Sequence, residues 1–185
     1  MISSIKQIKS KLGSIQKEIE KLEKQASKES QKLITKGFKE IFKKYPDLQS
    51  FSWTQYTPYF NDGDECTFSA NTESIYINDA EEDDSVYGLE QFLDKLKHPK
   101  KAINQLKKRI EEYKKEKYSY TWIEDEIERI ENGSIEETEH KLMMLQDIQQ
   151  IFSHIDDNCF RAMFGDHVRV TVTKKGWSTE SYEHD

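Results

Sequence analysis

The sequence has no long apolar run and little cysteine. No window of its 185 residues approaches the roughly eighteen apolar positions of a membrane helix, and lysines are scattered through the N-terminal segment. A membrane span and a signal peptide are therefore disfavoured, and we expect a cytoplasmic protein. The two cysteines, Cys66 and Cys159, have no CxxC spacing, which argues against a zinc ribbon and predicts reduced thiols.

Glycine is also scarce, and its placement argues against several enzyme classes. The seven glycines are scattered and form no GxSxG, GxxxxGK[ST] or GxGxxG motif. These motifs support nucleophilic catalysis, phosphate binding and dinucleotide binding. We therefore expect no cofactor and favour a protein that is not an enzyme.

Basic residues are missing from one long segment of the chain. Residues 46–94 contain 12 acidic residues and no lysine or arginine, whereas residues 1–45 contain 12 lysines and 5 glutamates. Residues 95–118 are again basic, with 10 basic and 3 acidic residues. The acidic remainder of the chain, and the absence of interleaved aromatic residues from the basic segments, argue against nucleic-acid binding.

The N-terminal segment has the clearest periodicity. Its apolar residues recur at alternating spacings of three and four, which is the heptad pattern of a coiled-coil seam. They are Ile5, Ile8, Leu12, Ile15, Ile19, Leu22 and Ala26. Pro46 ends the pattern, so residues 1–45 are predicted to form one coiled-coil helix. Periodicity leaves open whether the seam pairs within the chain or between chains, and we expect a homo-oligomer formed through the helices.

Helical periodicity returns in the middle of the chain and predicts helices over 86–97, 100–132 and 135–156. The second of these carries another seam from Ile103 to Ile130, and Gly133 supplies a stop after it. Ser134, followed three residues later by Glu137, forms a capping box that begins the third helix.

Elsewhere the period changes from that of a helix to that of a strand. Alternating apolar residues predict strands within 50–78, and the C-terminal segment HVRVTVTKKGWSTESYEHD predicts strands within 167–184. The fold class is therefore α+β. We expect a small antiparallel sheet of about five strands backed by helices, with long coiled-coil-like helices at the N-terminus and in the middle. Residues 46–185 are predicted to form the α+β domain.

The segment WTQYTPYFNDGDECTF, residues 53–68, is predicted to be a hairpin with an enlarged loop. Pro58 ends its first strand, and the sequence NDGD is a turn signal before the second. Tyr59 and Phe60 place aromatic rings in a tip that needs only polar residues. We expect these rings to fold back on an edge of the core.

The sheet face opposite the helices is predicted to mix acids, bases, phenols and imidazoles. Its members are Thr54, Tyr56, Glu65, Thr67, Tyr76, His167, Arg169, Thr171, Glu180, Tyr182 and His184. Two interpretations remain open: recognition of a nucleotide or phosphate through Arg169 and the imidazoles, or a solvated face. The binding candidates from this face and the hairpin are Tyr56, Tyr59, Phe60, Asp62, Asp64, Tyr76, His167, Arg169, Tyr182 and His184.

Residue types that bind divalent cations occur in the hairpin and at the C-terminus. They are Asp62, Asp64, Cys66, His167, His184 and Asp185. Their spacing fits neither the calcium template D-x-[DN]-x-[DN]-G-x5-E nor an HExxH or paired Cys/His pattern. No metal site is therefore predicted.

The hairpin and the C-terminal segment together resemble a known family. A WTQYTPYFNDGD-x-C-x-F hairpin, an HV-x-VT strand and a final Tyr-x-His-Asp are similar to those of short, uncharacterised proteins encoded in phage and bacterial genomes. The family has no established activity, so the resemblance implies a phage context without a reaction. It nominates Trp53, Gln55, Tyr56, Thr57, Pro58, Tyr59, Phe60, Asn61, Asp62, Gly63, Asp64, Cys66, His167, Tyr182, His184 and Asp185.

These observations favour a non-enzymatic interaction protein. In a phage setting it would be an accessory or counter-defence protein in the host cytosol, which inhibits a host protein by binding it or sequesters a small nucleotide ligand. One alternative is a metal-assisted hydrolase or nuclease that uses Asp62, Asp64, His167 and His184. This alternative requires the hairpin loop and the C-terminal strand to converge. Another is a structural coiled-coil protein of phage assembly.

Overall fold

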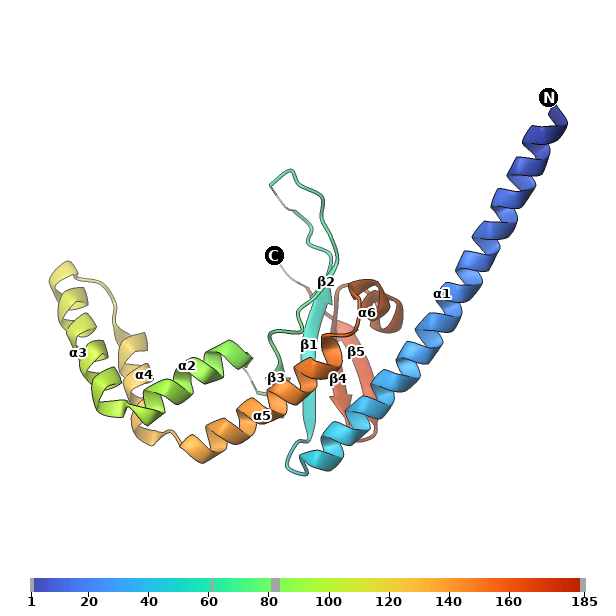
Figure 1. Ribbon diagram of the computed structural model, residues 1–185. Coiled ribbons are helices and arrows are strands. Elements are labelled where there is room, and N and C mark those ends of the chain that lie inside the picture. The colour runs from blue at the N-terminus through green and yellow to red at the C-terminus, as the bar shows by residue number, and fades with distance from the viewer. Residues whose placement is uncertain (1, 61, 81–83, 184–185) are drawn as a thin grey trace.

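The protein has an α+β fold, as predicted from the sequence (Figure 1). The structure is a computed structural model that describes residues 2–60, 62–80 and 84–183, with side chains described except at 2–8, 20, 23–24 and 26–27. The helices are α1 (Ile2–Lys44), α2 (Val86–Lys97), α3 (Pro99–Glu116), α4 (Thr121–Asn132), α5 (Ile135–Phe152) and α6 (Asp157–Phe164). The strands are β1 (Ser50–Tyr56), β2 (Ser69–Ala70), β3 (Tyr76–Ile77), β4 (Val168–Thr173) and β5 (Gly176–Ser181).

Strand β1 is the centre of a small antiparallel sheet with the order β2-β1-β4-β5. Strand β4 pairs with one edge of β1, and the short strands β2 and β3 both pair with β1 on its other side. Because side chains alternate between the two faces, the register places Phe51, Trp53 and Gln55 on the same face as the valines opposite them in β4.

Helices α1, α5 and α6 cover this face of the sheet, and Trp53 is fully buried beneath them. The ring centroid of Trp53 lies 4.9 Å from that of Phe152 in α5, and 5.9 Å and 5.3 Å from those of Phe160 and Phe164 in α6. Phe38 of α1 completes the cluster at 6.4 Å. Edge-to-face pairs of this kind add about 0.5–1.5 kcal/mol each beyond the burial of the rings.

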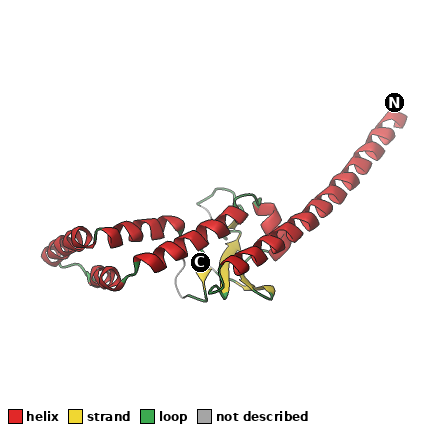
Figure 2. Cartoon of the chain, turned by 60° about the horizontal axis from the view of Figure 1, so that its bottom comes forward, coloured by secondary structure: helices red, strands yellow, loops and turns green. Residues whose placement is uncertain are grey.

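Helices α2 to α5 form an arm that extends from the sheet. Helix α2 packs against α5, and α3 and α4 lie at the far end (Figure 1 and Figure 2). Helices α3 and α4 have a small core of their own, built from Leu106, Ile110, Ile123 and Ile130. The seam predicted in the middle of the chain is therefore closed by residues of the same chain.

The single helix predicted over 100–132 is wrong, because the structure divides it in two. Helix α3 ends at Glu116, Lys117 adopts a left-handed conformation with φ of 59°, and α4 begins at Thr121. This break lets α4 fold back on α3, so that the apolar faces of the two helices bury each other.

The helix predicted over 135–156 ends early, and a further helix follows it. Helix α5 ends at Phe152, after starting at the predicted N-cap, Ser134, whose hydroxyl accepts a hydrogen bond from the Glu137 amide. Helix α6 then begins after Asp156, which caps it by accepting a hydrogen bond from the Asn158 amide at 2.8 Å. Eight residues are too few for helical periodicity to be recognised in the sequence.

The predicted strands in the hairpin region are much shorter in the structure. Strands β2 and β3 have two residues each, so residues 66–68 are not a strand. Residues 57–60 and 62–68 instead belong to a long excursion that projects beyond the sheet (Figure 1).

Helix α1 projects from the body of the protein, and only its C-terminal part joins the core (Figure 1). Ile34, Phe38, Ile41 and Phe42 are buried, whereas the described apolar residues of the heptad seam are exposed. The coiled-coil pairing of this seam stays a prediction. In the ranges that the structure describes, no helix is both long enough and apolar enough to cross a membrane.

Gly133, which joins α4 to α5, stands where α2 approaches the chain closely. A Cβ atom at this position would lie 2.6 Å from Cδ2 of Leu96 and 2.8 Å from the carbonyl oxygen of Arg129. Either distance is too short for a real contact, so a side chain here would push Leu96 of α2 away from the junction of α4 and α5 and would strain the end of α4.

We predict that Gly133→Ala lowers the free energy of unfolding by about 2 kcal/mol, the usual cost of overpacking. Gly13→Ala is the control, because no described atom lies within 4 Å of a Cβ at Gly13 and alanine favours a helix. Urea unfolding followed by circular dichroism measures both variants. Equal stability of Gly133→Ala and the unchanged protein would contradict the packing described here.

Candidate functional site

A buried amide ties the start of the hairpin to the end of α6. Gln55 is fully buried, and its Nε2 donates hydrogen bonds to the carbonyl oxygens of Phe160 at 3.2 Å and Gly165 at 2.6 Å. Its Oε1 accepts a hydrogen bond from Nε1 of Trp53 at 3.1 Å. Because the Gln55 amide both donates and accepts hydrogen bonds in the core, the C-terminal end of β1 is held in one position relative to α6.

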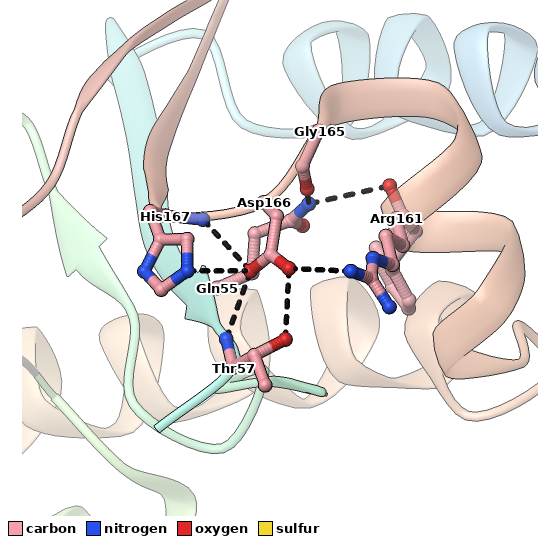
Figure 3. Close-up of polar contacts among 7 residues, drawn as sticks. Gln55, Thr57, Arg161, Gly165, Asp166 and His167 are labelled. Carbon is pink, nitrogen blue, oxygen red and sulfur yellow. Dashed lines mark hydrogen bonds and ion pairs between the residues drawn. The ribbon is translucent and has the colours of Figure 1, made fainter. Parts of the chain in front are cut away.

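Asp166 fastens the loop just beyond Gln55 (Figure 3). Its carboxylate accepts hydrogen bonds from the backbone amide and the hydroxyl of Thr57, both at 2.8 Å, and from the amide of His167 at 2.9 Å. The Arg161 guanidinium lies 2.8 Å from the same carboxylate, and the Arg161 side chain also lies over the ring of Phe68. Both ends of the 57–68 excursion are therefore held beside α6.

These contacts determine the ionisation of Asp166. Burial by itself would raise the pKa of its carboxyl group. The hydrogen bonds from the hydroxyl and amide of Thr57, with smaller contributions from His167, outweigh burial and lower the pKa below its ordinary value. Asp166 is thus a carboxylate at neutral pH, and its negative charge is used to position the loop.

The face of the sheet away from the helices is polar and contains five of the ten predicted binding residues. The register aligns Thr54 with Arg169, and Arg169 with Glu180, while Tyr76 lies opposite Ser52. Tyr182 continues this arrangement beyond β5, since its amide donates a hydrogen bond to the carbonyl of His167. We call this surface the open face.

The open face is less solvated at its centre than a fully exposed sheet would be. Ser52 and Thr54 are buried, because the chain from Asn71 to Asp79 passes beside β1. Asn71 donates a hydrogen bond from its side chain to the hydroxyl of Thr54 at 2.9 Å. Of the residues predicted on this face, Thr54 is therefore shielded from solvent.

A groove of about 650 Å³ lies on the open face. Hydroxyl, amide, phenol and carboxylate groups line it almost entirely: Thr54, Ser69, Ala70, Asn71, Thr72, Glu73, Ser74, Tyr76, Asp157 and Tyr182. Two of these residues are acidic and none is basic. Asp157 is also structural, since its carboxylate accepts a hydrogen bond from the Ala70 amide at 3.2 Å.

The arginine of the open face is already engaged by neighbouring side chains. The guanidinium of Arg169 lies 4.4 Å from the ring centroid of Tyr76, within the range of a cation–π interaction. Its Nε is 4.0 Å from a carboxylate oxygen of Glu180. Tyr56 and Tyr182 lie close to each other, with ring centroids 5.7 Å apart.

The loop residues reach away from the core, which corrects the expectation that their rings fold back. Tyr59 and Phe60 are 67% and 76% exposed, and Asp62 and Asp64 are exposed at the tip. Tyr59 instead stacks on the imidazole of His167, with ring centroids 4.9 Å apart and planes inclined by 9°. This stack joins the loop to the edge of the open face. The rings do not fold back because the loop is held at Thr57, where it starts, and not at its tip.

The structure thus places the predicted residues in two neighbouring groups. Tyr56, Tyr76, His167, Arg169 and Tyr182 belong to the open face, and the loop carries Tyr59, Phe60, Asp62 and Asp64. His184 and Asp185 lie outside the described residues, as does Asn61. Within the ranges that are described, no group of three or more His, Cys, Asp or Glu side chains is arranged to hold a metal ion.

Sequence reasoning missed the residues that hold these groups in place. Asp166 and Arg161 escaped notice because they act on a loop more than ninety positions away in the chain, and no local pattern marks such a contact. Asn71 and Asp157 were also missed, since no local pattern marks their contacts with Thr54 and with the Ala70 amide. Gln55 was nominated by resemblance, but its burial follows only from strand alternation with Phe51 and Trp53.

Comparisons of the chain with protein-family models, with curated proteins and with solved structures found no match. The function has to be inferred from the chemistry of the open face and the loop.

We predict that Asp166→Asn lowers the free energy of unfolding at pH 7 by about 2 kcal/mol, since hydrogen bonds to an ionised group are lost. A folded-state pKa below the ordinary value of 3.8 stabilises the protein above that pH, and this stabilisation is lost as the pH falls through the folded-state pKa. The difference between the variant and the unchanged protein should therefore shrink toward about pH 3.

Urea unfolding at pH 7, 5 and 3 tests this prediction. Asp64→Asn is the control, because Asp64 is exposed in the loop and its loss should leave the stability unchanged. A difference for Asp166→Asn that is constant over this pH range would show that the ionised carboxylate does not hold the loop.

Proposed function

We propose that the chain is a non-enzymatic interaction protein that binds a basic segment of another protein in the groove of the open face. The observation that carries the proposal is the lining of the groove, in which two phenol rings and two carboxylates accompany several hydroxyl groups without a lysine or arginine. Carboxylates attract a cationic side chain, and phenol rings accept it through cation–π contacts.

The open face already binds one cationic side chain of the protein itself through a phenol ring and a carboxylate. The guanidinium of Arg169 is accepted by the ring of Tyr76 and the carboxylate of Glu180. An arginine or lysine from a partner would meet groups of the same kinds, since the phenol of Tyr182 and the carboxylate of Glu73 both line the groove. Interfaces commonly use tyrosine in this way, because its ring offers apolar area and its hydroxyl a hydrogen bond.

The loop offers a second contact region beside the groove. Tyr59 and Phe60 expose aromatic rings, and Asp62 and Asp64 add negative charge to the same segment. The stack of Tyr59 on His167 connects this segment to the strand next to Tyr182. A partner segment that extends out of the groove would therefore meet more aromatic and acidic groups, which favours a peptide over a compact molecule.

The same charges speak against a small nucleotide as the ligand of the groove. Its phosphates would lie beside Glu73 and Asp157, and Arg169 would have to leave Tyr76 and Glu180 to reach them. On the resemblance to phage-encoded proteins, the partner would be a host protein with a basic surface. Inhibition of that protein is part of the proposal.

Titration with labelled peptides tests the proposal by fluorescence anisotropy. The probes are a decapeptide of alternating arginine and serine, the same peptide with glutamate in place of arginine, and ATP as a competitor. We expect binding of the basic peptide only. Tyr182→Ala and Glu73→Gln should each weaken it about tenfold, the usual effect of losing one strong contact.

Two exposed positions on other elements provide matched controls. Tyr87→Ala in α2 and Glu124→Gln in α4 remove the same groups outside the groove and should leave the affinity unchanged. Equal losses for Glu73→Gln and Glu124→Gln would show that the peptide responds only to the net charge of −7, and equal losses for Tyr182→Ala and Tyr87→Ala would show that the groove is not where it binds. Displacement of the peptide by ATP would favour nucleotide binding instead.

A further inference from the structure

The projecting part of α1 presents a continuous apolar stripe to solvent. Leu12, Ile15, Ile19 and Leu22 are 60%, 46%, 50% and 60% exposed, and they recur at spacings of three, four and three. Among the side chains of α1 that the structure describes, Ile34 is the first that is buried, so this stripe lies well outside the core. Figure 1 shows the helix extending away from the sheet and from the arm.

A stripe of this kind requires a partner helix. An isolated helix gains little stability in water from its own hydrogen bonds, and most helical stability comes from packing an apolar face. The 3-4-3 spacing is that of a coiled-coil seam, in which residues at the a and d positions of each heptad interlock with those of a second helix. Leu12 and Ile19 take the a positions, and Ile15 and Leu22 the d positions.

The geometry points to α1 of a second copy of this chain, packed antiparallel, as the occupant of the stripe. Charge complementarity at the g positions, which flank the seam, favours this occupant. Lys11 and Glu18 occupy two successive g positions. In an antiparallel pair g positions face g positions, so Lys11 of each helix faces Glu18 of the other when the helices cross midway between them.

The opposite orientation lacks this complementarity. In a parallel pair a g position faces the next e position of the partner helix. Lys11 would then face Gln16, and Glu18 would face position 23, which is also glutamate in the sequence. Like charges at such positions destabilise a coiled coil, so the charges select the antiparallel orientation.

The antiparallel crossing determines where the two bodies lie. It stacks Leu12 of each helix against Ile15 of the other at its centre. With a rise of 1.5 Å per residue, the two Ile34 residues would be about 60 Å apart, at opposite ends of the paired helices. The dimer does not depend on the proposed function. If that function holds as well, the dimer presents two grooves and binds a repetitive or dimeric partner with increased avidity.

Sedimentation velocity on the full chain over a range of concentrations tests the dimer and its orientation. We expect a mass twice the 21.9 kDa of one chain. Lys11→Glu and Glu18→Lys should each weaken the dimer about tenfold, because both Lys11–Glu18 pairs become repulsive. The double variant should regain the original affinity, since it restores both pairs with their charges exchanged.

Control variants separate this interface from general effects of charge and apolar area. Lys17→Glu makes the same charge change as Lys11→Glu on the side of α1 away from the stripe, and should leave the dimer intact. Ile15→Asn should give monomers, whereas Leu33→Asn should not, because Leu33 is exposed on α1 beyond the crossing region.

Three results would overturn the inference. One is a monomer at every concentration. Another is a dimer that Glu18→Lys strengthens, since that substitution improves only the parallel orientation. The third is a dimer that the double variant fails to restore.

Discussion

The packing of helices on one face of the sheet, centred on Trp53, is the interaction on which the rest of the structure depends. The indole is fully buried and contacts aromatic rings from α1, α5 and α6, so elements from both ends of the chain meet at one residue of β1. Because the apolar faces of these helices all pack on this side, no helix that the structure describes covers the other face of the sheet, and polar residues occupy it. The open face and its groove are a consequence of this one-sided core.

The candidate site is positioned by polar groups that sit at the boundary between the core and the open face. Gln55 points into the core and holds the end of α6, and Asp166 holds Thr57 at the start of the loop. Neither residue lines the groove. Because these contacts hold the start of the loop, Tyr59 reaches His167 although the tip of the loop does not pack against the rest of the protein.

Two stretches with similar heptad periodicity have different outcomes in this fold. The seam that begins at Ile103 is buried within the chain, because the break at Lys117 brings α4 back onto α3. The seam around Ile15 has no comparable break, so α1 continues as one helix with its apolar stripe exposed. A heptad seam is therefore buried within the same chain only where the backbone reverses direction, and hydrophobic periodicity does not indicate such a reversal.

The sequence by itself determined the fold class, the existence of most helices and the N-cap at Ser134, because helical and strand periods and capping are local properties of the chain. It also indicated that Thr54, Tyr76 and Arg169 share a face, since alternation follows from the pleat. Only the tertiary structure decided that Arg169 is engaged by Tyr76, that Asp166 anchors the loop and that the groove is acidic. These depend on contacts between residues far apart in the chain, which become neighbours only when the helices pack on the sheet.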